Sequence, residues 1–448
     1  MLLTELSTAR IPQIYKQFAA IVGESHWRNR VVQLKQEIRG NRFLAQHLQH
    51  ENALAYQFEH LRELTAKFGS IPSWETNNHA IYPAASFAAQ VLSIMELSSR
   101  QFAGQLKRRV HGALKNPDDM RGLRLELSAA THFARRARKL AWPEMTGDGT
   151  FDLLVKDVGP HGLAIECKAI SEDKGRKIHK REVLDFYGLL WPHIQSTIKG
   201  LNTGLSAVLT VTGRLPTKHA DRLALARQYG AVIFGGRGAS LPDGSTIRVA
   251  EFDASRLGDI PSTTRPGEVR ATIDEVTKTS NRQAMVIGTH AGGALALTVQ
   301  SGSDDIFMKA VFDTLSDSAK RQLSEDRSGM FLVGFHGIDG GQLFSIAGQD
   351  QDVAQSPTAL RLAVSRFLAS KERDHVVGVG FLSESALMPV QEGLVESGGT
   401  AYYFPKRESS LWSEDFSGLF QWMPPPADEA SEGELGGLDV ERGQCVSL

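Results

Sequence analysis

The sequence predicts an α/β protein with a helical N-terminal module. Three observations favour this class. Apolar residues recur three and four positions apart through much of residues 10–115, as they do in amphipathic helices. Short apolar runs of strand-like composition alternate with helical segments over residues 117–253, and again over residues 283–423. Strands separated by helices of this length are typical of a mixed or parallel sheet that is flanked by helices on both faces.

The composition is that of a globular protein. Of the 448 residues, 41% are hydrophobic and 23% are charged, and the formal net charge is -1, which argues against wholesale disorder and against indiscriminate polyanion binding. No apolar run approaches the roughly 20 residues that span a bilayer, and the first residues lack the pattern of a secretory signal. We therefore expect a cytoplasmic protein with no membrane partner. The only two cysteines, Cys167 and Cys445, exclude a disulfide framework and a thiolate zinc site.

Residues 1–116 are expected to form the helical N-terminal module. Helical periodicity runs through residues 31–69 and ends at Gly69, a plausible helix stop. A loop rich in Pro, Asn and Ser follows, and a further helix extends to about residue 115. The sequence breaks around residues 116–119, where we place the boundary of the next domain.

Residues 117–253 are expected to form the central α/β domain. A helix at about 121–141 precedes two apolar strands that are joined by a short turn, so these strands should be antiparallel neighbours. The expected elements are strands 151–157 and 163–170, helix 179–199, strand 205–213, helix 217–230 and strand 231–236.

The C-terminal third is expected to hold a linker with one short helix at 254–282, an accessory α/β domain at 283–423 and an acidic, disordered tail at 424–448. Asp339 and Gly340 lie between two apolar runs, which indicates a hairpin. The expected elements are strands 284–290 and 294–300, a helix near 305–324, the hairpin, a helix near 357–371, and strands 375–382 and 400–405.

The two strands of the central domain carry charged residues. Glu166 and Lys168 are two positions apart in one strand and therefore share a face, and Asp152 lies in the strand before it. If the strands pair, two carboxylates and an ammonium converge, and hard oxygen ligands suit Mg²⁺ or Mn²⁺. Lys168 can then orient or deprotonate a water. Glu126, beside the buried stripe of the preceding helix, can reach the same place. This chemistry indicates phosphodiester hydrolysis.

The arrangement resembles the PD-(D/E)XK nuclease superfamily over residues 121 to about 235. The shared pattern is a Glu-bearing helix, an Asp at the start of a strand, an apolar strand with Glu-x-Lys, and then helix, strand, helix, strand. The resemblance implies a restriction-endonuclease-like mixed sheet flanked by helices, with Glu126, Asp152 and Glu166 as metal ligands and Lys168 as the catalytic lysine. The proline that names the family is absent, because Phe151 precedes Asp152.

Basic residues follow the Glu-x-Lys strand and open the next helix. They either contact phosphates of a nucleic acid or form a solvated loop, and the residue pattern leaves both interpretations open. A second basic run at 107–115 offers the same choice. The candidates for nucleic-acid binding are Lys174, Arg176, Lys177, Lys180 and Arg181.

The expected function is that of a metal-dependent nuclease, with double-stranded DNA as the partner that the resemblance implies and with a role in restriction, repair or defence. Two alternatives remain open. One is an enzyme of the same fold that acts on RNA, and the other is an inactive protein that keeps the fold and binds nucleic acid or a partner. The flanking modules are expected to provide recognition, homo-oligomerisation or contact with a partner subunit.

Overall fold

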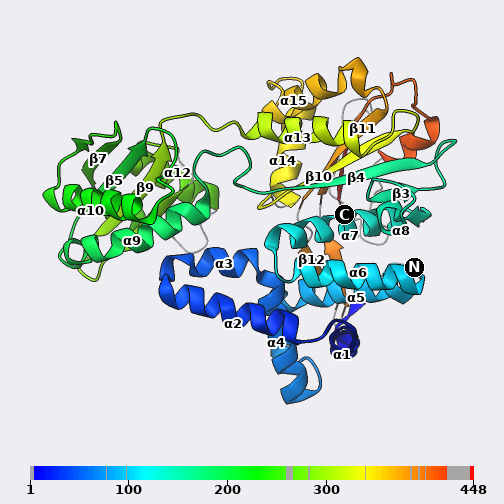
Figure 1. The fold of residues 1–448 in the computed structure, drawn as a ribbon, viewed down its shortest axis with the longest axis horizontal. Coiled ribbons are helices and arrows are strands. Elements are labelled where there is room, and N and C mark those ends of the chain that lie inside the picture. The colour runs from blue at the N-terminus through cyan, green and yellow to red at the C-terminus, as the bar shows by residue number, and fades with distance from the viewer. Residues whose placement is uncertain are drawn as a thin grey trace. The chain divides into compact units, whose positions relative to one another are not determined.

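The computed structural model contains two compact units (Figure 1). It describes residues 5–76, 78–96, 98–258, 266–280, 283–338, 340–383, 386–391, 394–398, 400–420 and 444–447. The first unit comprises Met1–Gln33, Glu51–Lys174 and Met308–Leu448, and the second comprises Leu34–His50 and Gly175–Phe307. Each unit contains a mixed sheet with helices, which confirms the α/β class. No helix among the described residues is long and apolar enough to cross a membrane.

Helices make up the N-terminal part of the first unit, as predicted. Their apolar faces meet around aromatic side chains, with the rings of Phe18 and Phe58 stacked at a centroid distance of 4.8 Å. Trp27 is fully buried beside them. The elements are β1 (Glu5–Ser7), η1 (Thr8–Arg10), α1 (Ile11–Val22), α2 (Ser25–Gly40), α4 (Ala53–Phe68), η3 (Ser73–Glu75), η4 (His79–Ile81), α5 (Tyr82–Glu96), α6 (Arg100–Ala113), α7 (Pro117–Arg135) and α8 (Pro143–Thr146).

A seven-stranded mixed sheet forms the centre of the first unit, in the order β15-β14-β11-β10-β4-β3-β2. The three central strands, β4, β10 and β11, are parallel, whereas β3 is antiparallel to both of its neighbours, β2 and β4. The strands are β2 (Leu140–Ala141), β3 (Leu153–Val155), β4 (Leu163–Ile170), β10 (Gly329–Phe335), β11 (Val376–Leu382), β14 (Thr400–Pro405) and β15 (Gln444–Ser447). A small sheet joins β1 to β12 (Ala386–Gln391) and β13 (Leu394–Gly398).

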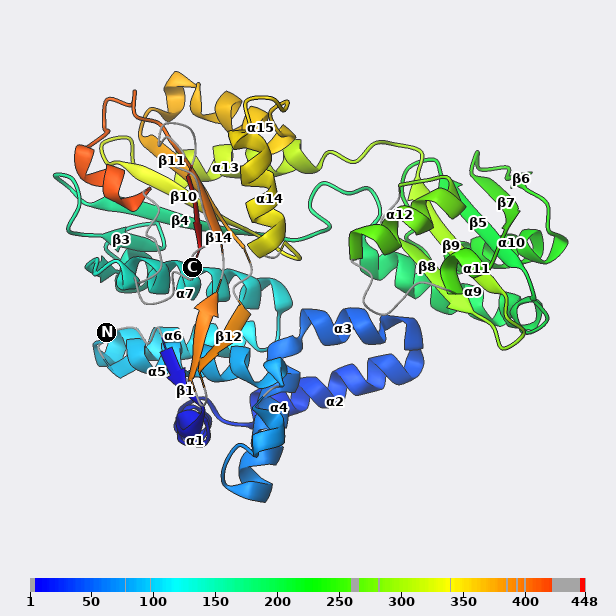
Figure 2. The same ribbon diagram turned by 180° about the vertical axis from the view of Figure 1, so that it is seen from behind.

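Helices cover both faces of this sheet. Figures 1 and 2 show α7 on one side of β4 and β10, and α13 and α15 on the other. Leu163 and Ile165 share a hydrophobic core with residues of α7, so the alternate positions of β4, including Glu166 and Lys168, face the other side. The remaining helices of this unit are α13 (Phe307–Arg321), α14 (Gly340–Gln351), α15 (Ala359–Leu368), η5 (Lys371–Arg373) and η6 (Glu414–Leu419).

The second unit contains a five-stranded sheet in the order β6-β7-β5-β9-β8. Its core includes two buried tyrosines whose hydroxyls donate to backbone carbonyls, from Tyr229 to Ala207 at 2.6 Å and from Tyr187 to Gln283 at 2.8 Å. Its elements are η2 (Arg42–Leu44), α3 (Ala45–Glu51), α9 (Lys180–Lys199), β5 (Gly204–Val211), α10 (His219–Gly235), β6 (Ala239–Ser240), β7 (Thr246–Phe252), α11 (Ser255–Gly258), α12 (Pro266–Thr277), β8 (Ala284–Gly288) and β9 (Ala294–Ser301).

The units differ from the predicted domains 1–116, 117–253 and 283–423. The strand that carries Glu166 pairs with β10, which lies about 160 positions later, and not with β5. The segment Gly175–Phe307 is therefore an insertion between β4 and α13. Local patterns could not reveal this, because β5 and β10 are both apolar strands preceded by a helix, and the choice between them is made by tertiary packing.

Three smaller expectations also differ. Residues 231–235 are helical rather than extended, because α10 continues to Gly235, and Gly236 caps it in the left-handed conformation. The short helix expected in the segment 254–282 is α12, but it belongs to the second unit and does not lie in a linker between two domains. β10 is followed by a helix and not by the second strand of the expected hairpin: Gly337 turns the chain with φ +83°, and α14 begins at Gly340. Asp339 and most of the acidic tail lie outside the described residues.

Candidate functional site

The structure places all four predicted site residues in the first unit, with Glu166 and Lys168 on the side of the sheet opposite α7, which carries Glu126. The carboxylate oxygens of Glu126, Asp152 and Glu166 do not all lie within 4.8 Å of one another. Glu126 comes from α7, Asp152 directly precedes β3, and Glu166 and Lys168 lie on β4. Leu153 pairs with Ile165 across the antiparallel strands, so the same register places Asp152, one residue before Leu153, opposite Glu166. The three carboxylates are all buried, with 6% of Glu126, 9% of Asp152 and 1% of Glu166 exposed.

The side chain of Asp152, just before the start of β3, accepts a hydrogen bond from the backbone of β4. Its Oδ2 accepts a hydrogen bond from the backbone N–H of Cys167 at 2.7 Å. The paired part of β3 begins at Leu153, so this side chain continues the hydrogen bonding of β4 where the β3 backbone stops. The contact holds the Asp152 carboxylate beside the β4 backbone, between Glu166 and Lys168 in the sequence.

Lys168 is held between two acceptors. Its Nζ donates to Oε1 of Glu166 at 2.6 Å and to Oε1 of Gln322, just after α13, at 2.8 Å. The other carboxylate oxygen of Glu166, Oε2, is buried and has no hydrogen-bond partner among the described residues. A buried, unpaired carboxylate oxygen is costly, and a cation is the partner that would satisfy it.

The carboxylates disfavour one another's ionisation. Burial, followed by the charges of Glu126 and Glu166, raises the pKa of Asp152 from 3.8 to about 8. Burial raises the pKa of Glu166 to about 7, although the ammonium of Lys168 opposes the rise. Burial also raises the pKa of Glu126, against the opposing effect of Arg109. Burial and neighbouring charges therefore favour the protonated forms of these acids, and a bound cation would favour their ionised forms.

Glu126 is held by an arginine that the sequence did not single out. Arg109 of α6 donates through Nη1 and Nη2 to both oxygens of Glu126, at 2.8 and 2.5 Å. Arg109 also lies 3.9 Å from the carboxylate of Glu144, a largely exposed residue of α8. This bidentate pair occupies Glu126 on the side of Arg109, so Glu126 can serve the metal only by sharing its carboxylate or through a water.

Substitution of Arg109 by Ala is expected to lower the free energy of unfolding by about 2 kcal/mol at pH 7. The value is below the roughly 3–5 kcal/mol for breaking a fully buried pair, because a third of the Arg109 side chain is exposed. Urea unfolding measures it. The double variant Arg109→Ala/Glu126→Gln should regain most of the loss, and equal loss in the single and double variants would contradict an electrostatic cause.

The five basic candidates are divided between the two units. Lys174 ends a segment of the first unit, and the other four belong to the second. Arg176 pairs with Asp305 at 3.3 Å, and Arg181 pairs with Glu37 at 2.8 Å. Two of the candidates are thus engaged by acids of their own unit, which favours a structural role for them.

Three neighbours of the site were missed by the sequence reasoning, namely Arg109, Glu144 and Gln322. Arg109 belongs to the basic run 107–115, but nothing in that run distinguishes it from its neighbours. Gln322 lies 154 positions from Lys168, beyond the insertion, so no local signal could have found it.

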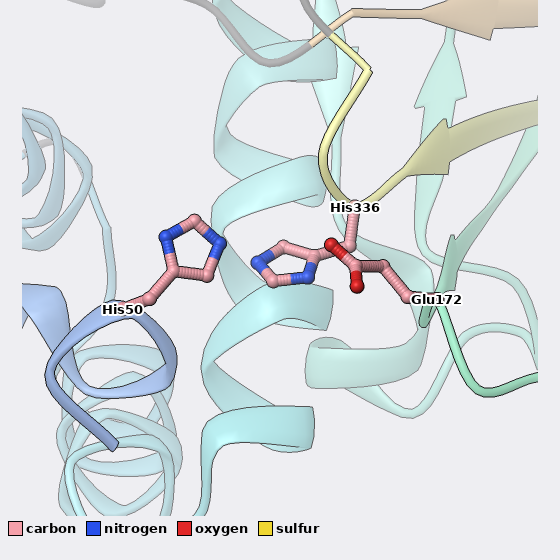
Figure 3. Close-up of side chains that lie close together, drawn as sticks. All are labelled: His50, Glu172 and His336. Atoms are coloured by element: carbon pink, nitrogen blue, oxygen red, sulfur yellow. The ribbon is translucent and has the colours of Figure 1, made fainter. Parts of the chain in front are cut away.

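A second group of polar side chains follows the carboxyl ends of β4 and β10. Figure 3 shows Glu172 and His336 side by side, and a carboxylate oxygen of Glu172 and a ring nitrogen of His336 lie within 4.8 Å of each other. His336 Nδ1 is also 3.6 Å from a carboxylate oxygen of Glu51. His50, also labelled in the figure, belongs to the second unit. This group does not have the all-oxygen ligand set that Mg²⁺ prefers.

Comparison with models of protein families, with curated proteins and with solved structures found no match to this chain.

Proposed function

We propose that this chain is a Mg²⁺- or Mn²⁺-dependent nuclease of the PD-(D/E)XK, restriction-endonuclease-like type, and that it hydrolyses phosphodiester bonds of double-stranded DNA. The observation that carries the proposal is the buried Oε2 of Glu166, which has no partner among the described residues. The other oxygen of this carboxylate accepts from Lys168, and the charges of Glu166 and Glu126 contribute to the raised pKa of Asp152. A structural ion pair between Glu166 and Lys168 would not require Asp152 and Glu126 to be buried nearby.

The donor set fits a hard divalent cation. Asp152 and Glu166 offer carboxylate oxygens in a place where burial, and then the charges of neighbouring carboxylates, raises both pKa values, and a cation offsets those charges. When bound, such an ion lowers the pKa of a coordinated water and offsets charge on the phosphate. Lys168, held by Glu166 and Gln322, orients the attacking water and stabilises the negative charge that develops on the phosphate.

The order of elements supports the same proposal. When the insertion Gly175–Phe307 is left out, the first unit continues after the Glu-x-Lys strand with α13, β10, α15 and β11, apart from the additional helix α14. This is the helix, strand, helix, strand order of the resemblance, now in one sheet whose strands β2, β3, β4, β10 and β11 lie in chain order. The helices and strands that fit the resemblance after the Glu-x-Lys strand therefore come from residues beyond the insertion, and not from the segment that ends at about residue 235.

One observation favours a second candidate, a protein that keeps the fold without cleaving. The guanidinium of Arg109 makes a bidentate ion pair with Glu126. This pair offsets the negative charge of a carboxylate that an active enzyme would use to hold the metal. Such a protein would bind nucleic acid or a partner with equal affinity in the presence and absence of divalent metal.

Incubation of the full chain with duplex DNA, single-stranded DNA and RNA, each with Mg²⁺, Mn²⁺ or EDTA, tests the proposal. We expect cleavage of duplex DNA with Mg²⁺ or Mn²⁺ and none with EDTA. Cleavage of RNA alone would support metal-dependent phosphodiester hydrolysis, with RNA instead of duplex DNA as the substrate. Metal-independent binding without products on any of the three substrates would favour the second candidate.

A further inference from the structure

A pocket lies at the carboxyl ends of the three parallel strands of the first unit. It has a volume of about 60 Å³, more than the roughly 10–15 Å³ that one water requires. Its walls come from α7 and from the ends of β4, β10 and β11. In α/β sheets with parallel strands, ligands bind outside the carboxyl ends of the strands. The polar lining residues are Arg121, Arg124, Ser128, His336 and Ser383.

Two arginines of α7 line the pocket. Arg121, Arg124 and Ser128 recur three and four positions apart, so they line the pocket from one face of the helix. Arg121 is paired with Glu51 and Asp118, and these two bonds use two of its five N–H donors. The planar fork of a guanidinium suits the oxygens of a phosphate or carboxylate.

The turn after β10 brings further donors to the same place. The segment FHGIDGG runs from the end of β10 into α14, and Gly337 has φ +83°, a conformation that favours glycine. A Cβ built on Gly340, the first residue of α14, would lie 3.8 Å from Oγ of Ser383. The amino end of a 12-residue helix is therefore adjacent to the pocket, and its N–H groups favour an anion.

Ser383 supplies a buried hydroxyl. Only 7% of this residue is exposed, and its Oγ accepts a hydrogen bond from the backbone N–H of Thr400 at 2.8 Å. Among the residues that the structure describes, no group accepts the hydroxyl hydrogen of Ser383. This donor is available to a ligand in the pocket, and a buried hydroxyl without an acceptor is unusual.

We propose that this pocket binds a phosphoryl group, either as inorganic phosphate or as the phosphate of a small phosphate monoester. Arg124, Ser128, His336 and Ser383 line the pocket, and its volume of about 60 Å³ accommodates a phosphoryl group, whereas any nucleoside attached to that group would extend outside. The site is distinct from the acidic cluster, because Glu166 lies four residues before the end of β4, roughly 13 Å along the strand. The proposal does not depend on nuclease activity.

Isothermal titration of the full chain in EDTA tests it, with inorganic phosphate, adenosine 5′-monophosphate and adenosine as ligands. We expect saturable binding of a phosphate-bearing ligand and none of adenosine. Tighter binding of the monophosphate identifies a phosphate monoester as the ligand, and equal binding identifies the phosphoryl group alone. Binding of adenosine as tight as that of its monophosphate, or no saturable binding of any ligand, would overturn the proposal.

Two arginines of the same helix provide a matched pair of variants. Arg124→Gln should weaken phosphate binding at least tenfold, whereas Arg135→Gln makes the same charge change on α7 outside the pocket and should leave it unchanged. Asp152→Asn should also retain the affinity. Equal weakening by both arginine variants, or loss of binding in Asp152→Asn, would contradict a site in this pocket. If Arg124→Gln does not fold, Ser128→Phe provides the test, because the larger side chain fills the pocket and should weaken phosphate binding.

Discussion

Substitution of Lys168 by Ala is expected to reduce metal-dependent cleavage by about 10²- to 10⁴-fold, the usual effect of losing a group that assists proton transfer. Lys168 is the ammonium within 2.6 Å of Glu166, and Gln322 holds it from the other side at 2.8 Å. Its removal takes a positive charge from the place where negative charge develops on the phosphate. Initial rates on duplex DNA at saturating Mg²⁺ measure the effect.

Lys156→Ala is the matched control, since Lys156 directly follows β3 and is exposed. It should cleave as well as the parent chain. Thermal melting distinguishes a catalytic loss from unfolding, and Lys168→Met, which keeps most of the aliphatic stem, serves if the Ala variant melts early. Unchanged cleavage by a folded Lys168 variant would show that this lysine takes no part in the reaction.

Substitution of Asp152 by Asn is expected to abolish cleavage and yet to stabilise the metal-free protein at pH 8.5. The Asn amide oxygen can still accept the hydrogen bond from the N–H of Cys167, whereas the repulsion from Glu126 and Glu166 disappears. The pKa of Asp152 is raised from 3.8 to about 8, and each unit corresponds to about 1.4 kcal/mol, so its ionisation costs the native state on the order of a few kcal/mol.

The pH dependence follows from the direction of this shift. Below pH 3.8 the Asp152 carboxyl is protonated in both the folded and the unfolded chain, so it carries no penalty. Between pH 3.8 and about 8 the folded state holds the proton that the unfolded state has lost, so stability falls as the pH rises. The Tm of the metal-free parent should therefore decrease from pH 5 to pH 8.5 more steeply than that of Asp152→Asn.

Metal addition gives an independent readout of the same site. Mn²⁺ must displace the protons from Asp152 and Glu166, so the rise in Tm on adding Mn²⁺ should grow with pH in the parent chain. In Asp152→Asn that rise should be largely lost. Identical pH profiles of the two proteins, with the same response to Mn²⁺, would contradict the assignment of Asp152 as an acid with a raised pKa at a metal site.

The hairpin that carries the candidate site could be predicted from the sequence alone. Its strands are short apolar runs joined by a turn, and period-two alternation places Glu166 and Lys168 on one face. The helix bearing Glu126 could also be predicted, from apolar residues three and four positions apart. These features depend on residues close together in the chain, so local patterns contain the information.

The partners of that hairpin were decided only by the tertiary structure. The strand beside β4 is β10, which follows the insertion Gly175–Phe307, and the residues that hold Lys168 and Glu126, namely Gln322 and Arg109, lie 154 and 17 positions away. The apolar composition of a strand indicates that the strand is buried, but it does not indicate which strand lies next to it. The choice depends on packing and burial summed over the whole unit, which no local window of the sequence contains.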